Sequence, residues 1–309
     1  MAMEFSDLNV FATVARHGNI TRAARRLNTV QSNVTTRLRL LEQELGVRLF
    51  QRHHQGVTLT RAGQDLLPFA QQAEALLQKA KDAVSQNGKP HGTLRLGSME
   101  TTAAARLPAL LKVYASRHRN VDIAVETGTT RNLIQGVLEY RLDGALVAGP
   151  VEHDDLEAIP SFVEELVLVS APQHRSLEAA LLEGKIHKVF VFRVGCSYRQ
   201  RLERFLGERG INLLSQLEFG TLEGIIGCVG AGLGITMLPF SVVEAYVRRK
   251  EVAVHRLPQE QARSETIFIS RRDTLRSLAL EEFVRTLNEA VRTAAYSSRK
   301  RTGNNSFAR

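Results

Sequence analysis

The chain has 309 residues, with 41 lysines and arginines against 32 aspartates and glutamates and a formal net charge of +9. Its length and its 43% hydrophobic content suffice for two or three folded units, and no stretch approaches the roughly 20 apolar residues of a membrane span. Two separated cysteines, Cys196 and Cys228, give no disulfide framework and no metal cluster, and the acidic N-terminus does not resemble a signal peptide, so we expect a cytoplasmic protein without a metal site.

The positive charge is unevenly distributed. Residues 1–90 hold 12 basic and 7 acidic side chains, residues 91–291 hold 24 and 25, and residues 292–309 hold 5 basic and no acidic ones. Because basic side chains release counterions from phosphates, the first segment is expected to face DNA. The neutral centre is expected to bind something other than a polyanion. Residues 297–309 lack apolar periodicity and are expected to form a disordered basic tail.

The first 49 residues predict three short helices. A helix over about 5–16 has one apolar face and is followed by Gly18, a residue that tolerates the positive φ of a helix end. Within residues 19–49 the apolar positions recur every three or four residues in two runs, which indicates two helices joined by a tight turn. This pattern is a helix-turn-helix, whose second helix can enter a major groove of DNA.

A wing and a long helix are predicted next. Residues 47–60 form two short β-like runs around a polar, basic, glycine-containing tip, as in a wing beside a helix-turn-helix. Residues 61–86 carry an apolar stripe that is too extensive for a solvated linker, so the same helix of a second subunit is its expected partner. The polar segment 85–92 contains glycine and proline and is expected to be a hinge.

Helical and strand patterns alternate beyond residue 92. This alternation predicts a mostly parallel sheet with ligands at the carboxyl ends of its strands, and there are enough elements for two α/β lobes with a cleft. The expected strands are 93–97, 121–126, 144–148, 166–170, 188–193, 217–219, 235–237 and 266–270, and the expected helices are 103–117, 132–140, 198–208 and 222–231.

A series of motifs resembles the LysR-type transcriptional regulators over essentially the whole chain up to its C-terminal tail. The motifs are Leu8–Phe11, Gly18–Ala24 and Gln31–Glu42 in the three helices, Leu45–Phe50 and Leu59–Gly63 around the wing, and Gly149–Pro150, Gly230–Ile235 and Leu238–Pro239 further on. A single helix-turn-helix is a weak signal, whereas this ordered series is specific.

The resemblance implies an α/β fold overall, with an N-terminal winged helix-turn-helix and a two-lobed effector domain similar to periplasmic binding proteins. The expected boundaries are 1–60 for the DNA-binding domain, 61–88 for the dimerising linker helix, 89–300 for the effector domain and 297–309 for the tail. Lobe 1 is expected over about 92–162 and 269–296, and lobe 2 over about 163–268. Strands near 162–170 and 263–270 are expected to bridge the lobes.

The resemblance also implies a mechanism. Two chains pair through their linker helices, two such dimers often form a tetramer, and a small inducer bound between the lobes changes the bend of promoter DNA and the contact with RNA polymerase. Closure of a cleft is a hinge movement, which suits this mechanism. No cofactor other than the inducer is expected, and the inducer, the operator and the direction of regulation are not given by the sequence.

Candidate DNA contacts lie on the recognition helix and the wing. Glutamine can pair with adenine and arginine with guanine, whereas serine and threonine are less selective. The family often has a basic residue where this chain has Thr36, so that contact is either supplied by Arg37 or lost. The candidates are Gln31, Ser32, Thr35, Thr36 and Arg37 on the helix, with Arg52 and His53 on the wing.

Candidate effector contacts follow the predicted strands, where free N–H groups at helix starts bind anions. Hydroxyls and a phenol suit a small carboxylate, whereas Glu100 favours a cation or a hydroxyl. Each serine or threonine here can equally be an ordinary helix cap. The candidates are Ser98, Glu100, Thr101, Thr102, Gly128, Thr129, Thr130, Gly149, Cys196, Ser197, Tyr198, Phe219 and Thr221.

Cys196 supports an alternative. It opens a predicted helix and precedes Arg199 and Arg201, so the helix dipole and these cations are expected to lower the pKa of its thiol, as in a redox-sensing regulator. The other interpretation is a structural or ligand-lining thiol. An enzyme is disfavoured because Leu202 stands where a phosphatase-like loop needs arginine and no triad motif is present. A purely architectural DNA-binding protein leaves the neutral α/β part unexplained.

Overall fold

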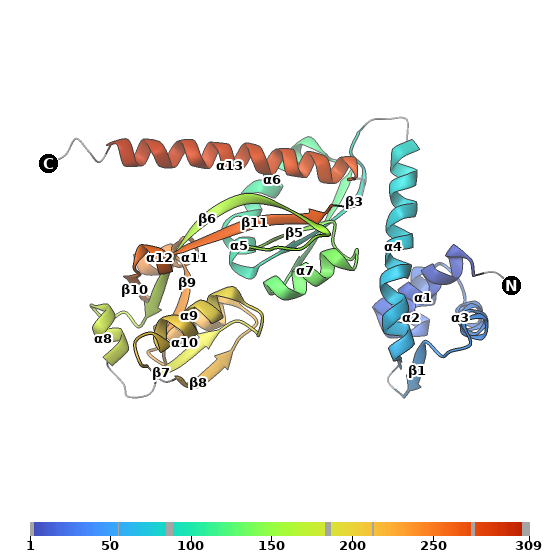
Figure 1. Ribbon diagram of the computed structural model, residues 1–309, viewed down its shortest axis with the longest axis horizontal. Coiled ribbons are helices and arrows are strands. Elements are labelled where there is room, and N and C mark those ends of the chain that lie inside the picture. The colour runs from blue at the N-terminus through green and yellow to red at the C-terminus, as the bar shows by residue number, and fades with distance from the viewer. Residues whose placement is uncertain are drawn as a thin grey trace. The chain divides into compact units, whose positions relative to one another are not determined.

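The computed structural model of the protein describes residues 3–54, 56–84, 89–182, 187–211, 213–272 and 276–304. The chain forms two compact units (Figure 1). Unit 1 comprises Met1–Gly88 with the short segment Glu139–Arg141, and unit 2 comprises Lys89–Leu138 and Leu142–Arg309. None of the helices in the described ranges combines the length and the apolar character that crossing a membrane requires. The first half of the hinge expected at residues 85–92 lies outside the described ranges.

Unit 1 begins with the three predicted helices, α1 (Phe5–His17), α2 (Ile20–Arg26) and α3 (Gln31–Leu45). Helix α1 ends at Gly18, which takes the left-handed conformation with φ 57° that the sequence predicts. Their apolar faces meet in one core, in which Phe11, Val34 and Ala23 are completely buried. The helix-turn-helix predicted from apolar spacing is confirmed.

The wing consists of two antiparallel strands, β1 (Phe50–His53) and β2 (Gly56–Leu59). Gly56 has φ 143°, and a Cβ at this position would lie 2.3 Å from the carbonyl oxygen of Gly18. Glycine is therefore required for the wing to reach the turn after α1. Helix α4 (Arg61–Val84) follows, and its Leu66, Leu67 and Ala70 pack on the core of unit 1.

Unit 2 contains a mixed sheet, and the expectation of a mostly parallel one is wrong. In the strand order β10-β6-β11-β5-β3-β4, with β9 also on β6, only the pairs β3–β4 and β3–β5 are parallel. A second sheet pairs β7 and β8 in parallel. The strands are β3 (Gly92–Ser98), β4 (Val121–Thr127), β5 (Gly144–Ala148), β6 (Leu156–Ser170), β7 (His187–Val191), β8 (Leu213–Glu218), β9 (Thr236–Pro239), β10 (Ala253–Arg256) and β11 (Arg263–Arg271).

The helices of unit 2 cover these strands. They are α5 (Glu100–Ala105), α6 (Leu107–Arg117), α7 (Thr130–Leu138), α8 (Leu177–Leu182), α9 (Ser197–Gly207), α10 (Leu222–Gly230), α11 (Phe240–Arg248), α12 (Gln259–Ala262) and α13 (Leu278–Asn304). The helix expected over 103–117 is divided between α5 and α6, because the backbone at Arg106 departs from the usual helical φ (−115°) and Pro108, the second residue of α6, favours the first turn of a new helix.

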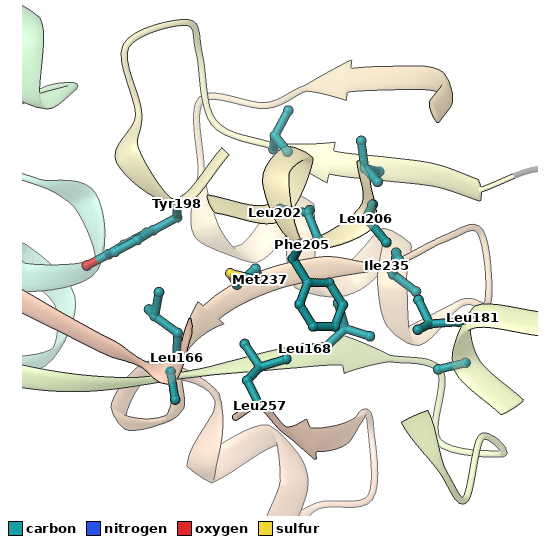
Figure 2. Close-up of a cluster of buried hydrophobic side chains, with 14 of the residues drawn as sticks. Leu166, Leu168, Leu181, Tyr198, Leu202, Phe205, Leu206, Ile235, Met237 and Leu257 are labelled. Atoms are coloured by element: carbon teal, nitrogen blue, oxygen red, sulfur yellow. The ribbon is translucent and has the colours of Figure 1, made fainter. Parts of the chain in front are cut away.

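Two long strands, β6 and β11, run through both lobes of unit 2 (Figure 1). In lobe 1, α6 and α13 pack on them around Tyr114, Phe268 and Phe283. In lobe 2, the same β6 continues into a core that also contains α9 and β9 (Figure 2). Glu164 of β6 is almost fully buried and accepts hydrogen bonds from Arg106 Nε (2.8 Å) and Ser241 Oγ (2.8 Å).

The C-terminal helix differs from its prediction. The sequence predicts disorder over residues 297–304, but α13 continues through them to Asn304, and residues 305–309 lie outside the described ranges. The preceding turns are rich in alanine, leucine, glutamate and arginine, which favour helix, and no proline or glycine interrupts the segment before Gly303. Basic composition without an apolar stripe therefore does not end this helix.

Candidate functional site

One face of α3 carries most of the predicted DNA contacts. Gln31, Ser32 and Thr36 are exposed and Thr35 is half-buried, and Arg39 is exposed one turn after Thr35. With 3.6 residues per turn, Ser32, Thr35, Thr36 and Arg39 lie on the side of the helix away from the buried Val34, Leu38 and Leu41, and Gln31, the first residue of α3, lies at the edge of that side. The Oε1 atom of Gln31 already accepts a hydrogen bond from the hydroxyl of Thr21 (3.0 Å).

Arg37 lies elsewhere. Its Nη1 donates to Asp7 Oδ1 (3.0 Å) and to Ser6 Oγ (2.7 Å), so it joins α3 to the start of α1 inside unit 1. The expectation that Arg37 replaces the missing basic contact at Thr36 is not supported by this geometry. The reason is helical periodicity, since Arg37 is three residues after Val34 and four before Leu41, both buried.

A groove between α3 and the wing gathers basic side chains. It has a volume of about 1210 Å³ and is lined by Arg39, Arg48 and Arg52, with Thr35 on the same wall. Arg52 and His53 are exposed on β1, as a DNA-contacting wing needs. Arg39 and Arg48 were not among the predicted contacts, although Arg39 was detectable from the sequence because it lies four residues after Thr35.

Unit 2 contains a cavity of about 310 Å³ at the carboxyl ends of four parallel-paired strands. Strands β3 and β4 come from lobe 1 and β7 and β8 from lobe 2, and the cavity residues follow directly after them. This is the position where ligands bind in open α/β sheets. The lining residues are Met99, Glu100, Thr101, Thr127, Gly128, Thr129, Thr130, Asn132, Phe192, Arg193, Cys196, Tyr198, Phe219 and Gly220.

Five predicted effector residues do not line this cavity. Ser98 and Thr102 are buried in the fold, and the hydroxyl of Ser98 donates to the Met99 carbonyl oxygen (3.1 Å). Thr221 caps α10 by accepting from Gly224 N (3.3 Å). Ser197 is the first residue of α9. Gly149 lines a separate polar cavity of about 360 Å³ with Pro150, Arg201, Gln259, Glu260, Arg263 and Glu265.

The hydroxyls that do line the cavity differ in what they already bind. Thr130 Oγ1 accepts from Ala148 N (3.3 Å) and donates to the Met99 sulfur (3.6 Å), so it serves the fold. Thr129 Oγ1 accepts from Asn132 N (3.4 Å) as an ordinary helix cap. The hydroxyls of Thr101 and Tyr198 are buried close to each other, and neither makes a hydrogen bond of normal geometry to any group in the described part of the chain. These two hydroxyls are available to a ligand.

Tyr198 bridges the core of lobe 2 and the cavity. Figure 2 shows its ring leaving the cluster of labelled apolar side chains, with the hydroxyl oxygen directed away from them. Burial raises the pKa of this phenol to about 12, and the nearby Thr101 hydroxyl opposes the increase. The phenol is therefore neutral at physiological pH and can donate a hydrogen bond to a ligand.

The cavity also contains side chains that were not predicted. Phe192 and Arg193 follow β7, Asn132 belongs to the first turn of α7, and Met99 precedes α5. Phe192, Arg193 and Met99 follow strands, so the same rule that selected Thr101 and Phe219 could have found them. Among the residues that the structure describes, no three His, Cys, Asp or Glu side chains are grouped so as to hold a metal ion.

The predicted thiolate character of Cys196 is wrong. Burial raises the pKa of its thiol, which outweighs the backbone N–H groups of Arg199 and Tyr198 and the charge of Arg199. The charge of Arg199 is already paired, because its guanidinium donates hydrogen bonds to Glu203 (3.0 Å), Glu218 and Gln216. A buried, protonated thiol is a poor nucleophile, so redox sensing through Cys196 is not favoured.

Family comparisons agree with both units. The family model described as "Bacterial regulatory helix-turn-helix protein, lysR family" matches residues 5–64, and "LysR substrate binding domain" matches residues 87–292. The chain belongs to the LysR family of transcriptional regulators. Unit 1 thus holds the DNA-binding domain of a LysR-type regulator and unit 2 its effector-binding domain, as the sequence motifs imply.

Similar LysR-family proteins match over nearly their full lengths. The HTH-type transcriptional regulator GltR of Bacillus subtilis is 42% identical over 282 residues, covering 91% of this chain and 95% of that protein. YofA of the same species is 42% identical over 290 residues, covering 94% and 100%.

Solved structures share the fold at lower identity. A full-length OxyR variant from Pseudomonas aeruginosa has a TM-score of 0.72 at 22% identity, covering 94% of this chain and 95% of that one. Full-length CbnR complexed with its target DNA has a TM-score of 0.66 at 22% identity, covering 93% and 99%. At these identities the likeness establishes the fold alone.

Proposed function

We propose that this LysR-type regulator binds promoter DNA through the exposed side of α3 and the wing, and that a small molecule held in the cavity of unit 2 alters that binding. The observation that carries the proposal is a cavity in which two buried hydroxyls, those of Thr101 and Tyr198, lack partners within the described residues. Buried polar groups are almost always hydrogen-bonded, to protein, to water or to a ligand, so these two hydroxyls are available to a molecule bound in the cavity. No further cofactor and no catalytic step is needed.

The side chains of unit 1 suit a DNA duplex. Gln31 and Ser32 at the start of α3 are placed to contact base edges, whereas Arg39, Arg48 and Arg52 in the adjoining groove suit phosphates. His53 extends this surface along the wing. We replace Arg37 by Arg39 in the proposed contact set, because Arg37 is bound to Asp7.

The effector acts by preferring one arrangement of the lobes. The cavity is lined by residues of both lobes, so a ligand that contacts both lobes binds the closed cleft more tightly than the open one. The difference between these two binding free energies is what is available for regulation. The positive end of helix α7 and Arg193, which lines the same cavity, suit an anionic group such as a carboxylate. The change is passed to promoter DNA and to its contact with RNA polymerase.

Helix α4 is the proposed dimer contact. One side of it packs on unit 1, while Phe69 and Leu76 on another side are each 66% exposed. Large apolar side chains exposed at a spacing of seven residues are typical of a helix that pairs with a second helix. We propose that two chains pair through this stripe and that two such dimers form a tetramer on DNA.

The proposal is tested by selecting genomic DNA fragments with the full-length protein and footprinting the tightest one, with and without a low-molecular-weight extract that contains the small metabolites of the same cells. We expect a long, interrupted protected region upstream of a gene and a change in its pattern when the extract is added. Arg39→Ala is expected to weaken this binding for all DNA sequences and to reduce its salt dependence by about one phosphate contact.

The matched control is Arg119→Ala, which removes an exposed arginine of unit 2 and is expected to leave the footprint unchanged. Uniform, salt-sensitive binding without a preferred site, with or without extract, would instead indicate an architectural DNA-binding protein. A selected site whose footprint ignores the extract would contradict the effector part of the proposal.

A further inference from the structure

Two opposite charges line the effector cavity from different lobes. Glu100 is the first residue of α5 in lobe 1 and is half-buried, and Arg193 follows β7 in lobe 2. Within the described part of the chain neither side chain has a hydrogen bond or an ion pair, whereas Arg199, Glu164 and Arg106 nearby in the fold all do. A carboxylate and a guanidinium that line one cavity without forming an ion pair are suited to a ligand that carries both charges.

The lobes approach closely at this point. A Cβ at Gly195, two residues after Arg193, would lie 2.9 Å from the hydroxyl oxygen of Thr129 in lobe 1. A Cβ at Gly220 would lie 3.5 Å from Nη2 of Arg193, so the guanidinium lies against bare backbone on the cavity wall. The charged groups therefore face a space with narrow limits, about 310 Å³, at the small end of the roughly 300–1,000 Å³ of small-molecule sites.

The rest of the lining fits a small molecule with an apolar portion. Thr101 and Tyr198 are each 3% exposed and supply hydroxyls without partners among the described residues. Phe192, Phe219 and Met99 supply apolar surface between these polar groups. A single ligand thus meets one negative group, one positive group, two neutral hydroxyls and an apolar wall.

We propose that the effector is a zwitterion of α-amino-acid size, with its ammonium group on the carboxylate of Glu100 and its carboxylate on the guanidinium of Arg193. The inference rests on the proposed effector function of this cavity and names the class of ligand. A molecule with both charges is bound by lobe 1 at one end and by lobe 2 at the other. A molecule with one charge leaves either Glu100 or Arg193 without a partner, so it binds more weakly and favours closure less.

The experiment uses the full-length protein and the twenty standard amino acids, added singly, with thermal unfolding as the first readout, because a ligand that binds only the folded state raises Tm. For each amino acid that raises Tm, calorimetric titration compares it with two analogues of the same side chain, an amine without the carboxylate and a carboxylic acid without the amino group. We expect both analogues to bind about 10- to 100-fold more weakly, as for loss of a hydrogen bond to a charged group.

Charge variants then assign each end of the ligand. Glu100→Gln is expected to weaken binding of the amino acid to about the level of the carboxylic acid and to leave the carboxylic acid unaffected. Arg193→Gln is expected to weaken binding of the amino acid to about the level of the amine and to leave binding of the amine unaffected. The matched controls are Glu244→Gln and Arg248→Gln, on exposed positions of α11, and they should leave all three affinities unchanged.

Three outcomes overturn the inference. One is a carboxylic acid that binds as tightly as the amino acid in both the parent and Glu100→Gln. Another is a fall in Tm on neutralising either charge without ligand together with loss of all discrimination, which would mean that Glu100 and Arg193 pair with each other. The last is a lack of binding by every amino acid. If metabolite extract still changes the DNA footprint, these results reject the zwitterion alone; if it does not, they reject the effector site itself.

Discussion

Arg37 and Arg39 are two arginines of one helix with different expected roles. Arg39→Ala is expected to lower DNA affinity, whereas Arg37→Ala is expected to lower the stability of unit 1 and leave affinity nearly unchanged. The difference follows from geometry, because Arg39 lines the groove beside the wing and Arg37 binds Asp7 and Ser6.

The magnitude can be worked from the contacts of Arg37. It makes two hydrogen bonds of 2.7 and 3.0 Å, but its side chain is 36% exposed and that of Asp7 is 20% exposed. A partly solvated pair of this kind contributes about 1 kcal/mol, less than a buried one. Loss of about 1 kcal/mol corresponds to roughly fivefold faster hydrogen exchange where exchange requires opening of the unit.

The assay is hydrogen–deuterium exchange of α1 and α3 peptides in the full-length protein, combined with DNA affinity over a range of salt concentrations. Arg39→Ala should reduce the salt dependence by about one phosphate contact without changing exchange. The reasoning is refuted if Arg37→Ala lowers DNA affinity as much as Arg39→Ala while exchange in α1 remains that of the parent.

Three further predictions concern titrating groups. Burial raises the pKa of both Tyr114 and Tyr198 from 10.0 to about 12, so an absorbance titration should show two of the five tyrosines ionising late, and stability should fall as the pH rises through this interval. Tyr114→Phe and Tyr198→Phe should each remove one late-ionising phenol, and an unchanged titration in both variants would contradict the burial. Because burial raises the pKa of Cys196, alkylation by iodoacetamide at neutral pH, followed by mass spectrometry, should be slower in the folded than in the unfolded chain, and equal rates would restore the redox alternative. Burial lowers the pKa of His255 below 6.5, so the unfolded chain binds a proton at this histidine more readily and the free energy of unfolding should decrease as the pH falls below 6.5. His255→Gln, which can still bind Ser170, should reduce that decrease in denaturant titrations at several pH values. The same decrease in the parent and in the variant would refute the prediction.

Local patterns were sufficient for much of the fold. The three helices of unit 1 and the wing follow from apolar spacing and glycine positions, and the strand ends of unit 2 led to Thr101 and Tyr198. Arg37 was predicted as a DNA contact from its residue type, whereas the spacing that marks Val34 and Leu41 as buried places it beside α1, where it binds Asp7. Helical position therefore favours Arg39 over Arg37 as the basic contact of this helix.

Other features depend on contacts that the sequence does not reveal. Thr101 and Thr130 are each the third residue after a strand, so the sequence does not distinguish them. Only Thr130 accepts a hydrogen bond from the backbone N–H of Ala148, which belongs to another strand. The pKa of Cys196 depends on how much water burial removes, which outweighs the cations visible in its neighbourhood. The antiparallel pairing of β6 with β11 joins segments about a hundred residues apart, so alternation of helices and strands did not predict it.

The paired strands β6 and β11 have a mechanical consequence. They remain hydrogen-bonded to each other from Arg263–Glu165 to Arg271–Leu156, with one register shift between Thr266 and Ile267, and they belong to both lobes. Relative movement of the lobes must therefore bend this two-stranded ribbon, most easily at the register shift, because the lobes are not joined by a flexible loop at this point. In the proposed mechanism, closure of the cleft bends this ribbon, and its resistance to bending favours the return of unit 2 to one geometry once the ligand leaves.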